Sequence, residues 1–122
     1  MDNQDFKTKL IHRSKLFSIN IWKLLDSFPE KNFSFEIIGK QILRSATSIG
    51  ANIVEAQASS SKKDFINFLH HALKSANETI YWLELILESG NVKNINIENL
   101  LKENRELANM LGSVILTLKG RK

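Results

Sequence analysis

The sequence predicts an all-α fold, an antiparallel up-down-up-down four-helix bundle. Apolar residues recur at alternating steps of three and four along four long segments, which is the spacing of one buried face on an α-helix. One proline and five glycines in 122 residues argue against a turn-rich β fold. A chain of this length can bury one modest hydrophobic core, so we expect a single domain over residues 1–122.

The first predicted helix covers residues 7–28. Pro29 ends it, because the residue before a proline is biased away from α geometry, and a short polar connection follows. The expected buried face consists of Leu10, Ser14, Phe17, Ile21, Leu24 and Phe28.

The second predicted helix covers residues 35–58 and ends before a run of three serines. Gly39 and Gly50 lie inside it, and each costs about 1 kcal/mol relative to alanine. We therefore expect a close approach to a neighbouring helix or a bend near Gly50. The expected buried face consists of Ile38, Ile42, Ala46, Ile49 and Ile53.

The third predicted helix covers residues 62–89. Ser61 stands three residues before Asp64, as in a capping box with aspartate in place of glutamate, and Gly90 supplies the stop. The expected buried face consists of Ile66, Leu69, Leu73, Ala76, Ile80, Leu83 and Leu87.

The fourth predicted helix covers residues 97–119 after a loop at 91–94. We expect Asn96 to be its N-cap and Ile95 to pack on Leu100 as a hydrophobic staple. The expected buried face consists of Leu100, Leu107, Leu111, Val114 and Leu118.

Small residues predict a close contact between the second and third helices. Ala46 and Gly50 on one side, and Ala72 and Ala76 on the other, leave room for the two backbones to approach.

Composition restricts the possible compartments. The chain has no cysteine, which excludes disulfides and thiolate metal sites. Its start lacks the basic and apolar pattern of a secretory signal, and no apolar run approaches the roughly 18–20 residues that span a bilayer. We expect a cytoplasmic protein without a membrane partner.

No residue pattern in the chain indicates an enzyme. The glycines are too dispersed to form a phosphate-binding loop, and the adjacent His70 and His71 diverge by about 100° on a helix. His71, Ser75 and Glu78 share one helical face, where they could be metal ligands or a base–nucleophile–acid set. No second ligand pair accompanies them. We expect no catalytic residues, no cofactor and no metal.

A line of polar residues lies close to the apolar faces of the second and third helices. If the two lines face each other, Arg44 can pair with Glu78, and Asn52 can satisfy Ser75 or a backbone group. The favoured role is structural, in helix register or a subunit contact, and ligand binding is the alternative. The motif consists of Arg44, Ser48, Asn52, Glu55, Ser75 and Glu78.

Two helices carry more apolar residues than their buried faces use. Ile19 and Trp22 lie off the face of the first helix, and Trp82 and Ile86 belong to an almost continuous apolar stretch of the third. Large exposed apolar patches usually mark interfaces, so we expect a homo-oligomer with the two tryptophans as anchors.

The net charge is +4, and the basic excess lies toward the two ends of the chain. The sequence has no aromatic interleaving and no helix-turn-helix spacing, so RNA or DNA binding would use phosphate contacts without base readout. The alternative is a solvated surface on a structural or protein–protein interaction module. The candidate nucleic-acid-binding residues are Lys7, Lys9, Arg13, Lys15, Lys102 and Arg105.

The middle of the chain resembles a known bacterial family. The matching positions are Phe28-Pro29, Gln41, Arg44, Ala46, Ser48, Ile49, Ala51, Asn52, Ile53 and Glu55, followed by Phe65, Phe68, Leu69, Ala72, Ser75 and Glu78. With these residues the chain resembles the small four-helix-bundle proteins first noticed in intervening sequences of 23S rRNA genes, the S23 type. It departs from the family pattern at Gly50, where proline is common, and at Ala56, where glycine is usual.

The resemblance implies a four-helix bundle assembled as a homopentamer, with no known enzymatic activity. Similar proteins include the accessory variability determinant of diversity-generating retroelements, a pentamer that binds a reverse transcriptase and nucleic acid. The resemblance therefore favours a nucleic-acid-binding accessory or scaffold protein, with itself, RNA or DNA, and a reverse transcriptase as candidate partners.

Overall fold

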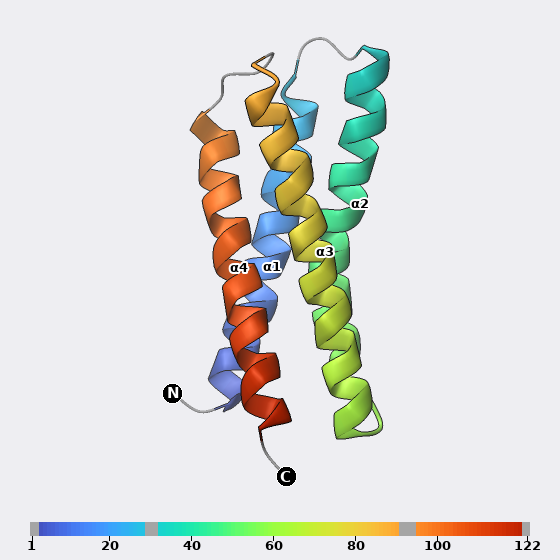
Figure 1. The fold of residues 1–122 in the computed structure, drawn as a ribbon, viewed down its shortest axis with the longest axis vertical. Coiled ribbons are helices and arrows are strands. Elements are labelled where there is room, and N and C mark those ends of the chain that lie inside the picture. The colour runs from blue at the N-terminus through green and yellow to red at the C-terminus, as the bar shows by residue number, and fades with distance from the viewer. Residues whose placement is uncertain (1–2, 29–31, 91–94, 121–122) are drawn as a thin grey trace.

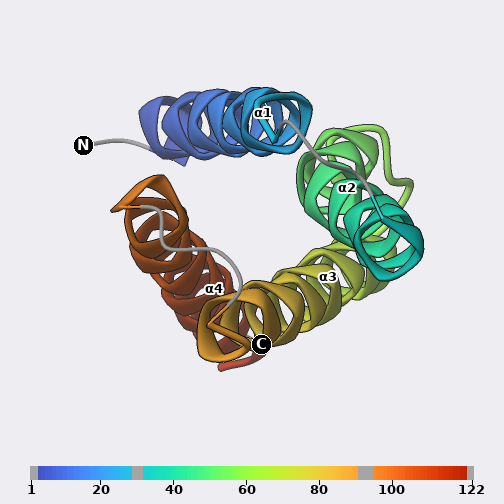
Figure 2. The same cartoon turned by 90° about the horizontal axis from the view of Figure 1, so that it is seen from above.

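The computed structural model describes residues 3–28, 32–90 and 95–120, and within these ranges the chain forms four helices and no strand. The helices are α1 (Asn3–Asp26), α2 (Phe33–Ala56), α3 (Lys62–Glu88) and α4 (Ile95–Lys119). Successive helices run in opposite directions (Figure 1). Each helix packs against two neighbours, so that α1 also contacts α4 and the four enclose one core (Figure 2). The predicted fold class is confirmed.

The residues next to the helix ends explain where α2 and α3 begin and where α3 ends. The side chain of Asn32 accepts a hydrogen bond from the Phe35 backbone N–H at 2.9 Å, so α2 starts earlier than predicted. The predicted Ser61 cap is confirmed by a bond from the Asp64 N–H at 3.1 Å. Gly90 follows the end of α3 with a φ of +73°, a left-handed conformation that favours glycine.

The predicted cap of α4 is wrong. The helix already includes Ile95, so Asn96 lies within its first turn and cannot precede it as a cap. The expected packing of Ile95 on Leu100 involves a side chain outside the described ones. Pro29, the predicted end of the first helix, lies outside the described residues.

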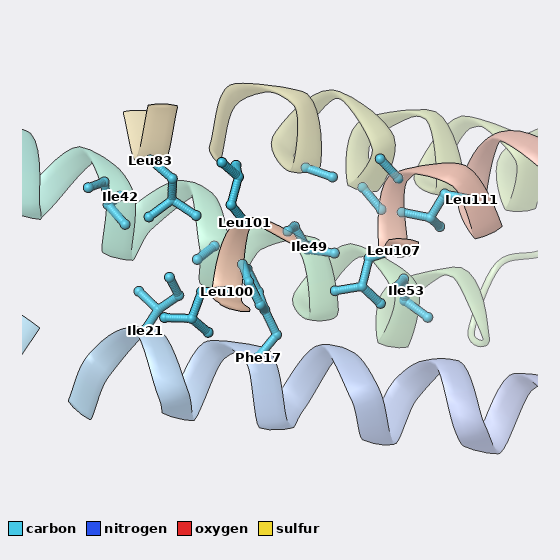
Figure 3. Packing of buried hydrophobic residues seen from close by; sticks show 14 of the residues in the cluster. Phe17, Ile21, Ile42, Ile49, Ile53, Leu83, Leu100, Leu101, Leu107 and Leu111 are labelled. Carbon is cyan, nitrogen blue, oxygen red and sulfur yellow. The ribbon is translucent and has the colours of Figure 1, made fainter. Parts of the chain in front are cut away.

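Apolar side chains from all four helices fill the centre of the bundle (Figure 3). The predicted faces of α1 and α2 are buried, apart from the half-buried Phe28 and Ile38, and α1 adds Leu25. On α4, Val114 and Leu118 are half-buried, while five residues that were not predicted are buried: Ile97, Leu101, Asn104, Ala108 and Ile115.

The buried face of α3 is rotated from the predicted one. It consists of Leu69, Ala72, Ala76, Thr79, Leu83 and Ile86. The predicted members Ile66, Leu73, Ile80 and Leu87 are only half-buried. The rotation centres on Thr79, whose hydroxyl donates to the Ser45 hydroxyl of α2 at 2.8 Å, while Ser45 donates to the Ile42 carbonyl at 3.2 Å. These two bonds satisfy hydroxyl groups that would otherwise be costly to bury.

Gly50 packs against α1 and not, as predicted, against α3. A Cβ added at Gly50 would lie 3.0 Å from the Ser14 hydroxyl oxygen and 3.5 Å from its Cβ. One turn earlier, the Ser18 hydroxyl of α1 donates to the Ala46 carbonyl at 3.3 Å. The α2–α3 contact is nevertheless the most extensive in the bundle, and Ala72 and Ala76 are fully buried within α3. The absence of a side chain at Gly50 therefore makes room for α1, while other residues of α2 form the contact with α3.

Asn104 joins α4 to α3 deep inside the bundle, where its side chain is fully buried. In the amide orientation that satisfies both groups, Nδ2 donates to the Ala76 carbonyl at 3.0 Å and Oδ1 accepts from the Ile80 N–H at 3.1 Å. The Asn104 side chain thus contacts two successive turns of α3 and fixes the position of α3 along α4.

We predict that Gly50→Leu destabilises the bundle by about 1–3 kcal/mol, because the new side chain would collide with Ser14 on α1. Gly112→Ala is the matched control, since nothing lies within 4 Å of its added Cβ. This substitution within α4 should stabilise the protein by about 0.4–1 kcal/mol. Chemical denaturation of both variants measures the two effects, and equal free energies of unfolding for Gly50→Leu and the parent would contradict the contact.

Candidate functional site

Arg13, one of the predicted nucleic-acid-binding residues, joins α1 to α4. Its Nε donates to Glu103 Oε2 at 3.0 Å and its Nη2 donates to Glu106 Oε2 at 3.0 Å. The pKa of the Arg13 guanidinium is raised above its usual value, mainly by the hydrogen bond to Glu103. Two carboxylates therefore offset its charge, and it offers little attraction to a phosphate.

The other five predicted basic residues differ in their surroundings. Arg105 donates to Glu84 on α3 at 2.7 Å, so its charge is also paired. Lys7 is half-buried, with its Nζ 5.4 Å from the centroid of the Phe65 ring. The side chains of Lys9, Lys15 and Lys102 are exposed.

A basic cluster that was not predicted lies at the end of the bundle where α3 begins and α4 ends. Lys62 and Lys63 from α3 and Lys119 from α4 line a hollow of about 440 Å³ together with His70. No aspartate or glutamate is among the described residues that line it. The adjacent lysines are visible in the sequence, and Lys119 joins them because α4 ends at the end of the bundle where α3 begins (Figure 1).

The polar motif joins α2 to α3 on the outside of the bundle. Arg44 forms the expected ion pair with Glu78, and its Nη2 also donates to Gln41 Oε1 at 2.9 Å. Glu78 Oε2 accepts a further bond from the Trp82 indole N–H at 3.0 Å. Four side chains from two helices are thus linked in one network, which holds the half-buried Trp82 in place.

The rest of the motif bonds within its own helix. The Ser48 hydroxyl donates to the Arg44 carbonyl, and Asn52 Nδ2 donates to the Ser48 carbonyl, both at 2.8 Å. Asn52 therefore satisfies a backbone group, which was one of the two predicted arrangements. Ser75 is half-buried and Glu55 is exposed.

The residues predicted to form an oligomer interface divide into two groups. Ile19 and Trp22 are 45% and 59% exposed, and with Leu16 they form an exposed apolar face on α1. On α3, Ile86 is buried in the core, and Trp82 is half-buried. The exposed apolar side chains of that stretch are instead Tyr81 and Leu85.

The histidines do not converge with other ligands. All three are exposed, and within the described ranges no group of three or more histidine or carboxylate side chains could hold a metal ion. Glu78, which shares a helical face with His71, is paired with Arg44. None of the helices in the described part of the chain carries an apolar stretch that could span a bilayer.

Two comparisons with known proteins point to the same family. The model of the family described as 23S rRNA-intervening sequence protein matches residues 7–113. A crystal structure of a protein with unknown function from the S23 ribosomal protein family of Bacteroides thetaiotaomicron VPI-5482 is 40% identical and superposes with a TM-score of 0.81. The match covers 89% of this chain and 96% of that one. No curated protein matches.

We predict that Arg44 and Glu78 contribute jointly to stability. Arg44→Gln and Glu78→Gln keep the approximate size of each side chain and remove its charge, and the glutamine at position 78 can still accept from Trp82. Because both side chains are partly exposed, a double-mutant cycle should give a coupling of about 0.2–1 kcal/mol in the free energy of unfolding. The Arg105–Glu84 pair is a matched comparison on the α3–α4 contact. Strict additivity of the Arg44 and Glu78 substitutions would show that their pairing does not stabilise the bundle.

Proposed function

Because the chain belongs to the 23S rRNA-intervening sequence protein family, we propose that it is a non-catalytic, oligomeric accessory or scaffold protein that binds nucleic acid through phosphate contacts. The observation that carries this proposal is the basic cluster of Lys62, Lys63 and Lys119 around one hollow. Lysine ammonium groups bind phosphates as point charges and do not read bases, so the contacts would be insensitive to sequence.

The proposal includes assembly into a homopentamer. The exposed apolar face of Leu16, Ile19 and Trp22 is the kind of surface that another copy of the chain would cover. A net charge of +4 gives each chain a weak field, whereas five copies would give a strong one. Assembly therefore supports binding, because a single chain presents only a few cations in any one place.

The second candidate is a structural or protein–protein interaction module without a nucleic-acid role. The observation that favours it is the pairing of Arg13 and Arg105 with glutamates of the same chain. These ion pairs remove two of the six predicted basic residues from the charge available to a polyanion. The two candidates differ in whether intact protein binds RNA or DNA at low salt.

We predict that Ile19→Glu combined with Trp22→Glu dissociates the pentamer, because two carboxylates would have to be buried in the contact. Sedimentation velocity at micromolar concentration should show a pentamer for the parent and smaller species for the variant. Leu116→Glu places one carboxylate on α4, at a side chain that is 75% exposed, and should leave the pentamer intact. A parent that sediments as a monomer would remove the oligomer from the proposal. If Leu116→Glu dissociates the pentamer and the double variant does not, the interface lies on α4 and not on α1.

We predict that replacing Lys62, Lys63 and Lys119 with glutamine weakens binding to unrelated RNA and DNA by similar factors. The slope of log K against log salt should flatten by about 0.7–0.9 for each phosphate that the variant no longer neutralises. Fluorescence anisotropy of labelled oligonucleotides across a salt series measures both effects.

The control is Arg13→Gln. The Arg13 guanidinium already pairs with Glu103 and Glu106, so its loss should change the affinity for nucleic acid much less. If the parent fails to bind any oligonucleotide at low salt, the structural module becomes the better function.

A further inference from the structure

α1 and α3 begin, and α2 and α4 end, at the same end of the bundle (Figure 1). Residues at these four helix ends line an open apolar cavity of about 510 Å³. All four helices contribute to its lining. Its floor includes Leu10, Ile53 and Leu69, which are also members of the hydrophobic core. The cavity is therefore an open continuation of the core, and its volume lies within the roughly 300–1,000 Å³ typical of sites for small molecules.

The charged side chains that line this cavity are Lys7 and Lys62. The half-buried Lys7 holds its ammonium 5.4 Å from the centroid of the Phe65 ring, which is also part of the lining. Lys62 is exposed and also lines the basic hollow described above, so the two hollows adjoin. Leu118 is shared in the same way.

Neither hollow has an acidic side chain among its described lining residues. Asp64, in the first turn of α3, accepts a hydrogen bond from the Ser60 hydroxyl at 3.0 Å and is outside both linings. The end of the bundle thus combines an apolar interior with a mouth at which Lys7, Lys63 and Lys119 provide positive charge. A ligand that fits both parts has an apolar body and an anionic head.

We propose that the two adjoining hollows form one binding site for an amphipathic anion, a carboxylate on an unbranched acyl chain. The acyl chain lies in the apolar cavity, and the carboxylate lies among Lys7, Lys63 and Lys119, which line the two hollows. A nucleic-acid phosphate could use the lysines but would leave the apolar cavity unfilled, so a macromolecular polyanion does not account for this part of the site. The site does not depend on the proposed nucleic-acid role.

The two parts of the ligand make different contributions. Burial of the acyl chain provides most of the affinity, which should rise by about fourfold for each added methylene until the cavity is full. The lysines are near solvent, so their ion pairs with the carboxylate add less and mainly select an anion over a cation. Isothermal titration calorimetry with octanoate and decanoate, below their micellar concentrations, tests the length dependence.

Head-group selectivity is tested with decanol and decyltrimethylammonium, which carry the same chain without the negative charge. We expect decanoate to bind most tightly and the cation to bind least tightly. The combined substitutions Lys7→Gln and Lys119→Gln should weaken decanoate binding by about two- to fivefold, which is the size expected for solvent-exposed ion pairs. They should leave decanol binding unchanged. Lys23→Gln, in the last turn of α1 at the other end of that helix, is the control and should change neither.

Access to the cavity is tested with a pair of adjacent tryptophan substitutions on α4. Thr117 is exposed and lines the cavity, so Thr117→Trp should fold and should weaken decanoate binding at least about tenfold, by removing space for two or more methylenes. The neighbouring Leu116 is exposed and outside the lining, so Leu116→Trp should bind decanoate like the parent.

Three results would overturn the proposal. The first is no detectable binding of decanoate to the parent. The second is equal affinity for decanoate, decanol and the cation, which would show that the site does not recognise the head group. The third is an equal effect of Thr117→Trp and Leu116→Trp, which would place the ligand elsewhere. None of these results bears on oligonucleotide binding, so the two proposals stand or fall separately.

Discussion

The bundle depends on polar contacts that fix how its four helices are placed along one another. Apolar faces alone allow neighbouring helices to slide, because leucine and isoleucine pack acceptably in more than one register. A buried polar group that loses its partner costs about 1–3 kcal/mol, so a slipped register is penalised wherever such a group is buried. Each helix–helix contact has at least one polar tie, which is buried in the α2–α3 and α3–α4 contacts and half-buried in the other two. The ties are Ser18 to Ala46 for α1–α2, Thr79 to Ser45 for α2–α3, Asn104 to Ala76 and Ile80 for α3–α4, and Arg13 to Glu103 for α1–α4.

The sequence predicts which face of a helix is buried much better than it predicts which neighbour covers that face. Periodicity correctly identifies the buried faces of α1 and α2, because apolar residues there recur with few polar interruptions. It misplaces the face of α3, because Thr79 is counted as polar until its partner Ser45 is known. It misses Asn104 for the same reason. It also assigns Gly50 to the wrong neighbouring helix. A small residue indicates that another helix comes close, but it does not indicate which helix.

The candidate site is harder to predict because its residues are distant in sequence. Arg13 is expected to be an exposed cation, but its partner Glu103 lies 90 positions further along the chain and offsets its charge. The cluster of Lys62, Lys63 and Lys119 likewise forms only when the antiparallel topology places the end of α4 beside the start of α3. The ion pair of the polar motif was predictable, since both of its residues lie in recognisable polar lines on helices that follow one another in the chain.

The open cavity follows from the way the bundle is closed. The contact between α1 and α4 is the least extensive of the four, and side chains from the start of α1 and the end of α4 line the cavity. Its floor is made of Leu10, Ile53 and Leu69, so an apolar ligand there would cover the same side chains that hold the helices together. A ligand that binds only the folded state raises the free energy of unfolding by RT ln(1 + [L]/Kd). Here the ligand would do so by completing the core between the two helices that contact each other least. Stability and ligand binding at this end are therefore expected to be coupled through one continuous apolar surface.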